Sequence, residues 1–352
     1  MGIVKLAILD DWQSIGAPYF TKAVPDVQIT TFSETLNPKN PADLEKLTKR
    51  LESFSIISTM RERTPFPAEL LHKLPNLRLL LTTGMRNASL DLQACKALGI
   101  VVAGTDTRHN PPTENPKRAV PDSTTMHTWT LILALSRHIA RDDAAVKTGG
   151  WQGQTLATTV AGKTLGLCGL GRLGSAVGRI AIQSWGMRVV CWSSSLTQDT
   201  ADEKARSVGL EAGDFEVVSK EELFREADVL SVHYVLSPRS TGIIGQKELS
   251  VMKRSALLVN TSRGPLIDEA ALLDVCKRGA ITGVALDVFN LEPLPDDSQW
   301  RNTGWGQSGR SNVLLTPHTG YAEQEVFDCW YTENAENAKR WLNGQELTAR
   351  LN

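Results

Sequence analysis

The chain has 352 residues, of which 41% are hydrophobic and 22% are charged, and its formal net charge is -1 at pH 7. This composition predicts a globular protein of two domains, and the near-zero charge excludes a strong electrostatic preference for nucleic acid or an anionic membrane. Five scattered cysteines without a CxxC pair or a His/Cys cluster predict free thiols in a reducing compartment and no metal site. The N-terminus enters a strand at once and no apolar run reaches membrane-spanning length, which predicts a cytoplasmic protein.

The first part of the chain alternates short strands with helices. This alternation is typical of a mostly parallel sheet with helices on both faces. The pattern breaks at 108–121, where four prolines predict a loop or linker, because proline neither continues a helix nor pairs in a central strand. We expect strands at 4–10, 54–59, 77–83 and 100–104, and helices near 42–51, 67–74 and 90–98.

A single long helix is expected over 123–149, and it leads into a second strand and helix alternation. A final helix at 322–344 is expected to return to the first domain, because the second sheet is complete before it. The predicted fold class is therefore α/β, with two doubly wound parallel-sheet domains. In the second part we expect strands near 163–168, 187–192, 227–233, 255–261, 281–289 and 312–318, and helices at 171–181, 220–227 and 268–279.

A glycine turn, GLGRLG, stands between the first strand of the second part and the helix that follows. In this GxGxxG pattern the first glycine permits a tight turn, the second lets backbone approach a pyrophosphate, and the third allows close packing of helix on strand. The helix N-terminus then faces the phosphates. The context favours a dinucleotide site, with contacts from Gly169, Leu170, Gly171, Arg172, Leu173 and Gly174.

The end of the next strand bears on the choice of dinucleotide, because an NAD-preferring site usually carries Asp or Glu there. Here Ser193 and Ser194 follow the strand, so the carboxylate is absent. Hydroxyls can bond either a hydroxyl or a phosphate, and no like charge opposes a 2′-phosphate. We therefore expect NADP(H) to be favoured, with NAD(H) possible, and Arg188, Lys204 or Arg206 as candidate cations.

Three motifs in the last third of the chain place a polar side chain after a strand-like run: Arg263 in NTSRGP, Glu292 in FNLEPLP and His318 in TPHTG. Arginine can anchor a carboxylate and polarise a keto oxygen, and histidine can supply or take a proton. Glutamate bonded to that histidine would fix its tautomer and stabilise the imidazolium. Taken singly, each residue is more often a surface or structural group, but their order behind a glycine turn indicates reduction of a 2-keto acid.

The chain resembles the D-isomer-specific 2-hydroxyacid dehydrogenase family in GLGRLG, SVHYVLSPRSTGIIG, MKRSALLVNTSRGPLIDEAALL, GVALDVFNLEPLP, NVLLTPHTGY and, in the first domain, GMRNASLDL. The resemblance implies a Rossmann-type coenzyme domain, 125–320, inserted in a flavodoxin-like substrate-binding domain, 1–124 plus 321–352. It also implies a homodimer formed mostly by the coenzyme domains. The sequence departs from the family pattern at Ser193, in place of the ribose acid, and at Met126, where many members carry glutamate.

The same resemblance implies that the enzyme reduces a 2-keto acid to the D-2-hydroxy acid, and catalyses the reverse. Its substrate-binding arginine falls on Arg263, its histidine-assisting acid on Glu292 and its acid/base on His318. Asp287 looks like the aspartate beside the nicotinamide amide. Further cofactor contacts are implied at Ser193, Ser194, His233, Leu236, Thr261, Arg263, His318 and Gly320.

In the first domain, TTGMRNAS follows a strand. Backbone N–H groups around Thr83, Gly84 and Met85 are candidates to hold a substrate carboxylate opposite Arg263. Arg86 either adds charge there or starts the next helix as a surface residue. Together with His318, these residues form the predicted substrate-binding set.

Two further segments have open roles. Arg61 follows another strand of the first domain, where it either borders the cleft or forms a surface salt bridge. The loop 296–312 carries Trp300 and Trp305 and could overhang the site, although a dimer contact or surface packing is favoured.

Two alternative functions follow from the same residues. A dinucleotide-binding regulatory protein or corepressor could reuse the fold, but the intact trio Arg263, Glu292 and His318 argues against a purely binding role. An enzyme for a phosphorylated acid or formate is the other alternative. A phosphorylated substrate should require an additional basic cluster in the first domain, and the sequence identifies none clearly.

Overall fold

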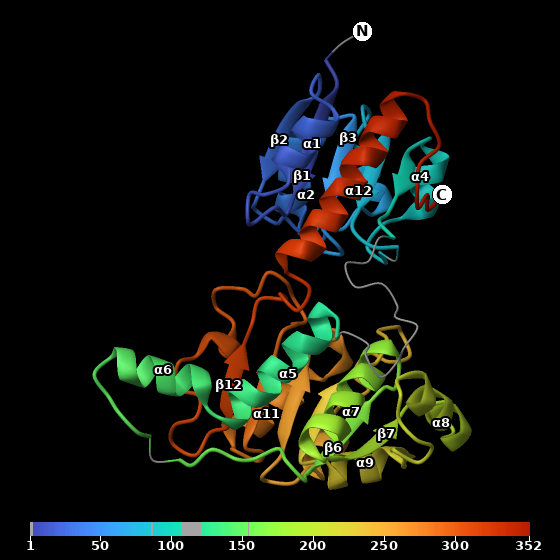
Figure 1. Cartoon of the computed structure of the whole chain (residues 1–352). Helices are drawn as coiled ribbons and strands as arrows, with labels where there is room; N and C mark the ends of the chain where they lie inside the picture. Colours follow the sequence, from blue (N-terminus) through green and yellow to red (C-terminus); the bar gives the residue numbers. More distant parts are fainter. Residues whose placement is uncertain (1–2, 86, 107–120, 154) are drawn as a thin grey trace. The chain divides into compact units, whose positions relative to one another are not determined.

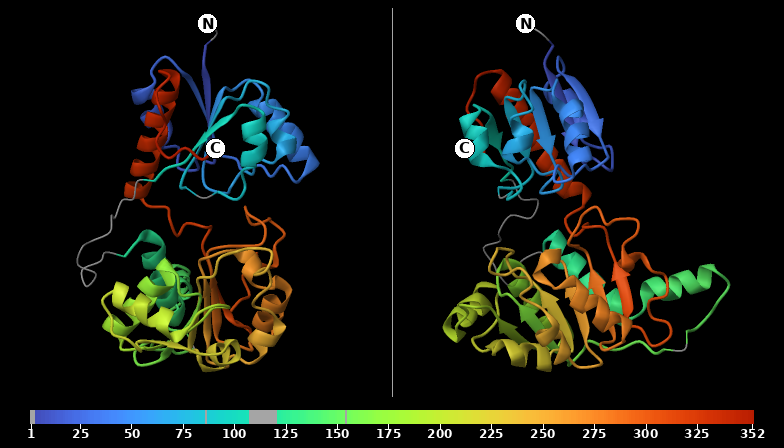
Figure 2. Two further views of the ribbon diagram at one scale, coloured as in Figure 1. Left: turned by 90° about the vertical axis from the view of Figure 1, so that its right-hand side faces the viewer. Right: turned by 180° about the vertical axis from the view of Figure 1, so that it is seen from behind.

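The computed structural model describes residues 3–85, 87–106, 121–153 and 155–352. The chain divides into two compact units, Met1–His109 with Glu323–Asn352 (unit 1) and Asn110–Ala322 (unit 2). Each unit consists of a parallel sheet with helices on its faces (Figures 1 and 2). The predicted α/β class with two doubly wound sheets is thereby confirmed. The predicted linker, 108–121, lies outside the described residues except for Pro121.

Unit 1 is built on a five-stranded parallel sheet in the order β2-β1-β3-β4-β5. This is the flavodoxin-like order. Its central strands are apolar runs such as LAIL and LLL, which do not alternate because both faces of the sheet are covered. The strands are β1 (Lys5–Leu9), β2 (Gln28–Phe32), β3 (Ile56–Thr59), β4 (Leu79–Thr82) and β5 (Val101–Ala103), and the helices are α1 (Ala17–Ala23), α2 (Pro41–Leu51), α3 (Ala68–Leu71), α4 (Leu92–Ala97) and α12 (Gln324–Leu342).

The last helix, α12, belongs to unit 1 and packs against α1 and β4. Tyr331 of α12 meets Phe20 of α1 edge to face, and both rings are buried. The sequence interpretation missed α1 and β2. The first has only seven residues, and the second is a partly exposed strand at the edge of the sheet without a clear apolar pattern.

Unit 2 is built on a seven-stranded parallel sheet in the order β12-β11-β10-β9-β6-β7-β8. This is the Rossmann-type order, and its switch point lies between β6 and β9. The strands are β6 (Thr164–Cys168), β7 (Arg188–Trp192), β8 (Phe215–Val217), β9 (Val229–Val232), β10 (Leu257–Asn260), β11 (Gly283–Leu286) and β12 (Asn312–Leu315), and the helices are α5 (Ser123–Ser136), α6 (Ile139–Lys147), α7 (Arg172–Trp185), α8 (Gln198–Ser207), α9 (Lys220–Glu226), α10 (Gln246–Ser250) and α11 (Glu269–Lys277).

The prediction of a single helix over 123–149 is wrong, since the structure has two helices there, α5 and α6. His138 separates them with a φ of 57°, in the left-handed region, where a right-handed helix cannot continue. α5 packs against α7 and β10, whereas α6 buries none of its side chains and extends away from the sheet (Figures 1 and 2).

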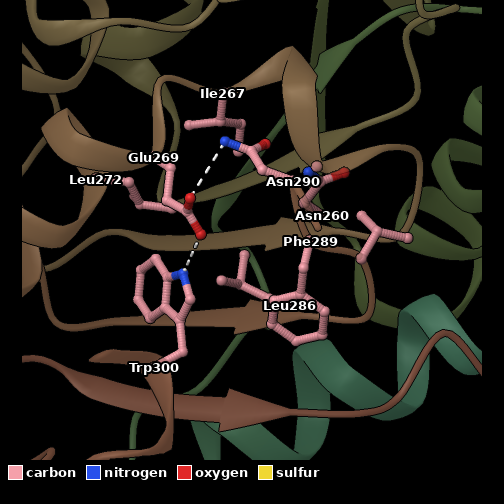
Figure 3. A pocket seen from close by; sticks show the side chains of 10 residues that line it. Asn260, Ile267, Glu269, Leu272, Leu286, Phe289, Asn290 and Trp300 are labelled. Atoms are coloured by element: carbon pink, nitrogen blue, oxygen red, sulfur yellow. Dashed lines mark hydrogen bonds between the residues drawn. The ribbon is translucent and has the colours of Figure 1, made fainter. Parts of the chain in front are cut away.

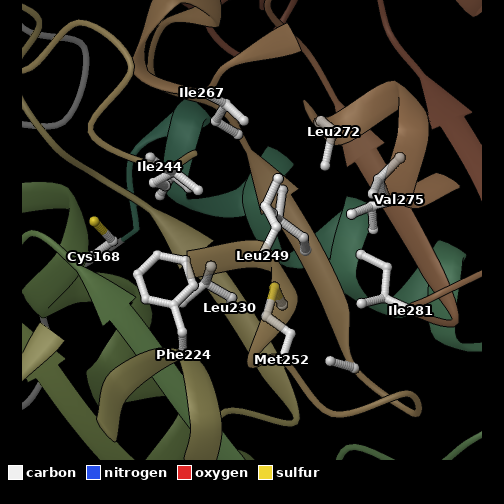
Figure 4. Packing of buried hydrophobic residues seen from close by; sticks show 14 of the residues in the cluster. Cys168, Phe224, Leu230, Ile244, Leu249, Met252, Ile267, Leu272, Val275 and Ile281 are labelled. Atoms are coloured by element: carbon white, nitrogen blue, oxygen red, sulfur yellow. The ribbon is translucent and has the colours of Figure 1, made fainter. Parts of the chain in front are cut away.

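The largest buried cluster of unit 2 fills the space between the sheet and helices α9, α10 and α11. Figure 4 shows Phe224 of α9 beside Leu230 of β9, with Leu249 of α10 and Val275 of α11 in the same cluster. All five cysteines of the chain are free thiols; four are buried and Cys329 is partly exposed. In the described part of the chain, no helix is both long and apolar enough to cross a membrane.

The residues of the sequence motifs follow the carboxyl ends of the strands and so lie at one edge of the unit 2 sheet. Because every pair of neighbouring strands is parallel, the residue after each strand end lies at the same edge, where open α/β sheets bind ligands. These residues are Gly169 after β6, Ser193 after β7, His233 after β9, Thr261 after β10, Asp287 after β11 and Thr316 after β12.

Candidate active site

The glycine turn after β6 is shaped by close backbone contacts. Gly169 has a φ of 103°, and a Cβ there would lie 2.6 Å from the carbonyl oxygen of His233. A Cβ at Gly174 would lie 2.3 Å from the Gly169 oxygen. Neither position accepts a side chain, which is the packing that the first and third glycines of the pattern predict.

Gly171 differs, because no atom lies within 4 Å of the position its Cβ would take. It is the N-cap of α7, and the first N–H groups of that helix have no partner within the helix. A cradle of bare backbone at a helix N-terminus suits the pyrophosphate of a dinucleotide. The geometry therefore fits the cofactor that the sequence predicts.

Side chains around the turn have different environments. Leu170 packs into the unit 2 core, so only its backbone can face a ligand, while Leu173 is partly exposed. Arg172 is exposed and forms an ion pair with Asp122, the N-cap of α5. Thr261 is buried, and its hydroxyl lies 2.8 Å from that of Thr128 on α5.

His233 packs beside Gly169 at the switch point and is 9% exposed. Burial lowers its pKa to about 4, so the ring is neutral at pH 7. Its Nε2 lies 2.8 Å from the Ser231 hydroxyl, and its Nδ1 has no hydrogen-bond partner among the described residues. A buried ring nitrogen of this kind at the switch point also fits a bound ligand.

The end of β7, where the ribose would lie, is lined with hydroxyls. The Tyr234 hydroxyl donates to Ser194 Oγ at 2.8 Å and accepts from the Ser194 N–H at 3.2 Å. The Tyr234 ring stacks on Trp192, with centroids 5.8 Å apart. Sequence reasoning did not assign Tyr234 or Trp192, which carry no signal for this position in an isolated sequence.

The prediction that Arg188 is a candidate cation for the ribose site is wrong. Arg188 is the first residue of β7, at the opposite edge of the sheet from the predicted cofactor site. Its guanidinium is bound to Glu216 and Glu226 at 2.7 and 2.6 Å. The other two candidates, Lys204 and Arg206, lie in the last turn of α8.

His318 and Glu292 are in direct contact. The His318 Nδ1 lies 2.5 Å from Glu292 Oε2, and the other carboxylate oxygen accepts the Phe289 N–H at 2.8 Å. Because a carboxylate only accepts, Nδ1 carries the proton in this pair. His318 has a φ of 53°, an uncommon conformation for a residue with a side chain and one often found at functional sites.

The Arg263 loop lies against the loop that carries Glu292. A Cβ at Gly264 would lie 2.1 Å from the carbonyl carbon of Phe289, so only glycine allows this approach. The Asn260 side chain donates to the Arg263 carbonyl at 3.0 Å and holds the loop at the end of β10. The structure therefore assembles the loops of the three predicted residues at the same edge of one sheet.

Asp287, 1% exposed, holds the turn after β12. Its oxygens accept from the Thr316 hydroxyl at 2.6 Å, the Thr319 N–H at 2.9 Å and the Gly320 N–H at 3.0 Å. The implied cofactor residue Gly320 thus lies beside Asp287. Leu236 follows β9 and is 37% exposed.

In unit 1, Thr83 and Gly84 follow β4. The Gly84 N–H donates to Thr105 Oγ1 at 2.8 Å, and Thr83 Oγ1 accepts from the Arg61 N–H at 2.9 Å. The Arg61 guanidinium lies over the Trp330 ring, 5.7 Å from its centroid. Met85 is 40% exposed, and Arg86 lies outside the described residues.

The loop 296–312 packs its tryptophans inward. Trp300 is 2% exposed and donates from Nε1 to Glu269 at 2.8 Å, and Asn290 donates to the other oxygen of Glu269 at 3.3 Å (Figure 3). Trp305 donates to the Trp300 carbonyl at 3.1 Å. Trp300, Glu269 and Asn290 line a small pocket together with Gly264. The inward contacts of both tryptophans favour the packing role for these rings.

Within the described residues, no group of three or more His, Cys, Asp or Glu is arranged to hold a metal ion. Comparison with protein families matches residues 129–320 to the NAD-binding domain of D-isomer-specific 2-hydroxyacid dehydrogenases. A glyoxylate reductase from Aeropyrum pernix is 32% identical over 307 residues, 85% of this chain and 83% of that protein. The family resemblance read from the sequence is confirmed.

Solved structures agree. A phosphoglycerate oxidoreductase from Vibrio cholerae O395 superposes with a TM-score of 0.82 at 29% identity, over 97% of this chain and 100% of that one. A D-lactate dehydrogenase from Aquifex aeolicus, solved with NAD and lactic acid, gives a TM-score of 0.69 at 26% identity, over 96% of each chain.

Proposed function

The chain belongs to the D-isomer-specific 2-hydroxyacid dehydrogenase family, a family of NAD-dependent enzymes, and from that premise we propose that it reduces a 2-keto acid to the D-2-hydroxy acid and catalyses the reverse. The observation that carries the proposal is the His318–Glu292 hydrogen bond beside the Arg263 loop, on the sheet edge that also holds the glycine turn. An anion clamp and a proton donor at a dinucleotide site are what such a reduction requires.

In this proposal His318 protonates the keto oxygen from Nε2, because Nδ1 is engaged with Glu292. Glu292 keeps the ring in that tautomer and stabilises the imidazolium before transfer. Arg263 binds the substrate carboxylate through its planar set of donors and polarises the keto oxygen. The bound nicotinamide supplies the hydride.

We propose that the dinucleotide is held by the backbone of Gly169, Gly171 and Gly174, with Asp287 beside the nicotinamide amide. For the ribose we keep NADP(H) as the favoured cofactor and NAD(H) as possible. The hydroxyl lining at Ser193 and Ser194 supports acceptance of a 2′-phosphate, since it brings no carboxylate. Because Arg188 is paired with Glu216, it does not support the preference for NADP(H).

In unit 1, we propose that the turn after β4 binds the substrate carboxylate. The Gly84 N–H is already bonded to Thr105, and a Cβ at Gly84 would lie 2.5 Å from Nη1 of Arg61, so glycine here makes room for the Arg61 guanidinium beside the turn. The remaining donors are the backbone N–H groups of Thr83 and Met85, with Arg86 as a further candidate.

An initial-rate matrix tests the reaction. NADH and NADPH are each assayed against glyoxylate, hydroxypyruvate, pyruvate, 2-ketoisocaproate, phenylpyruvate and benzoylformate, with His318→Ala as the control variant. We expect at least one acid to oxidise a cofactor in the wild type and not in the variant. If none does, or if the variant is as fast as wild type, the proposed reaction is wrong, and a clear NADH advantage contradicts the NADP(H) preference.

We also propose a homodimer through the coenzyme domains. The support is α6 and the segment after it, which expose Ile139, Val146, Trp151 and Leu156 at 57%, 52%, 77% and 93%. Exposed apolar side chains on a projecting element are typical of an interface. Light scattering after gel filtration should give twice the chain mass for wild type and a smaller mass for Trp151→Glu/Leu156→Glu. A monomeric wild type contradicts this proposal.

A further inference from the structure

His127 lies on α5, far in sequence from the three motifs, yet its ring contacts the turn that carries His318. Its Nε2 lies 3.0 Å from Thr316 Oγ1 and 3.2 Å from Asp287 Oδ1. The His127 side chain is 18% exposed. Gly320 closes another side of the ring, since a Cβ there would lie 3.4 Å from His127 Cδ2.

The proton positions in this cluster follow from its hydrogen bonds. The Thr316 hydroxyl donates its one proton to Asp287, so toward His127 the Thr316 oxygen can only accept. An ionised carboxylate also only accepts. Both neighbours of the His127 Nε2 therefore face it as acceptors, and Nε2 must carry the proton.

The ionised state of the Asp287 carboxylate depends on hydrogen-bond donors of this kind. Burial favours its neutral form, but the hydrogen bonds from His127, Thr316 and Thr319 outweigh burial and hold the pKa of Asp287 below its ordinary value. The ionised carboxylate then binds the N–H groups of Thr319 and Gly320, the two residues that follow His318.

His318 is thus held from two directions. Glu292 binds its ring, and Asp287 binds the backbone directly after it. The left-handed backbone of His318, with a φ of 53°, is a conformation that persists only where its surroundings enforce it. The Asp287 contacts supply that constraint, and His127 is the donor that reaches them from a different element.

We propose that His127 is a positioning residue: it donates from Nε2 to Asp287 and Thr316, and through them holds the backbone of the turn that presents His318. The effect on catalysis rests on the proposed function, whereas the hydrogen bond itself does not. His127 acts without touching the substrate, in contrast to Arg263 and His318.

Kinetics test the effect on catalysis. His127→Phe keeps a ring of similar size and removes the donor, so we expect kcat to fall about tenfold or more, as small displacements of a reacting group do. His127→Gln restores a nitrogen donor of similar reach and should stay within about threefold of wild type. His72→Phe, at an exposed position of unit 1, is the matched control and should match wild type. Equal kcat losses in the Gln and Phe variants, or none in Phe, would overturn the proposal.

A second measurement does not depend on activity. The chain has six histidines, few enough to assign ring signals by single substitution in protein labelled at histidine. Nitrogen chemical shifts at neutral pH should show a protonated Nε2 in His127, and Thr316→Val should shift that signal. A bare Nε2, or a protonated one whose signal Thr316→Val leaves unchanged, overturns the proposal even in an active enzyme. A protonated Nε2 whose signal that substitution shifts supports the hydrogen bond even if no keto acid is reduced.

Discussion

Two turns at the same edge of the unit 2 sheet are built in opposite ways. The turn after β6 consists of backbone packed on backbone, with Gly169 and Gly174 at contacts that exclude any side chain. The turn after β12 is held by side chains, namely Asp287 under its backbone and Glu292 on its histidine. A phosphate cradle requires side chains to be absent, whereas a proton donor has to be held from several sides. The two turns should therefore fail differently when altered.

The largest effect is expected from His318→Gln, in the turn built from side chains. Loss of a general acid should lower kcat by about 10²- to 10⁴-fold, because glutamine cannot transfer a proton. Dinucleotide affinity, measured by fluorescence titration, should change by less than about twofold, which corresponds to under 0.5 kcal/mol. If affinity falls as far as kcat, the two turns do not have separate roles.

His233, beside the turn built from backbone, should make the fold sensitive to acid. Its pKa is about 4 in the folded state against 6.5 as its ordinary value, so the unfolded chain binds the proton more readily. The stabilisation is complete above pH 6.5 and is lost as pH falls toward 4, by about 3 kcal/mol. Urea midpoints at pH 7.5 and 4.5 should differ less for His233→Gln than for wild type.

The comparison between variant and wild type is needed because carboxylates with a lowered pKa, such as Asp228 and Asp287, also make the fold less stable as pH falls. They contribute equally to both proteins. An identical pH dependence for the two would show that His233 is not a buried neutral base.

Gly171→Ala is expected to weaken dinucleotide binding without harming the fold. The new methyl group enters the open cradle, so Kd should rise about tenfold, or about 1.4 kcal/mol. The unfolding free energy should change by less than about 1 kcal/mol, the size of an N-cap effect. Gly174→Ala, whose methyl would meet the Gly169 oxygen, should instead destabilise the fold. Similar stability losses in both would contradict the assignment of the open cradle.

The smallest effect is expected for Trp300→Phe, which removes the hydrogen bond from the loop 296–312 to Glu269 of α11. One hydrogen bond contributes about 1 kcal/mol, and that is the expected loss in chemical denaturation. The value of kcat should stay close to that of wild type, since Glu292 and His318 keep their contact. A kcat loss larger than the stability loss would assign the loop 296–312 a role in catalysis.

The strong local patterns explain what the sequence could predict of the fold. Runs such as LLL and LLVN are buried on both faces and bounded by turns, so most of the parallel strands of both sheets were predictable, whereas the three-residue edge strand β8 was not expected. The short α1 and the half-exposed β2 have no such pattern. The break between α5 and α6 depends on the backbone of His138, which a helical periodicity does not reveal.

In the candidate site, too, residues in local motifs were predictable and contacts that depend on packing were not. Arg263, Glu292 and His318 stand in short motifs after strands, and strand ends in a parallel sheet share one edge, so their assembly was predictable. Their roles stay predictions. His127 was missed because its contact to Asp287 depends on how α5 packs. Arg188 was wrong because it begins β7, and the start and the end of a strand lie at opposite edges of a parallel sheet; the expected strand at 187–192 already implied this.

The place of α12 in unit 1 has a consequence for the time at which each unit can complete its fold during synthesis. Unit 2 is one continuous segment, whereas unit 1 begins the described chain and is completed by α12 only after unit 2 has been made. Until then Phe20 lacks the Tyr331 ring that lies against it in the finished structure. On the ribosome, all residues of unit 2 are therefore synthesised before those of α12. Until α12 emerges, the sheet of unit 1 exposes the apolar surface that this helix covers in the finished structure.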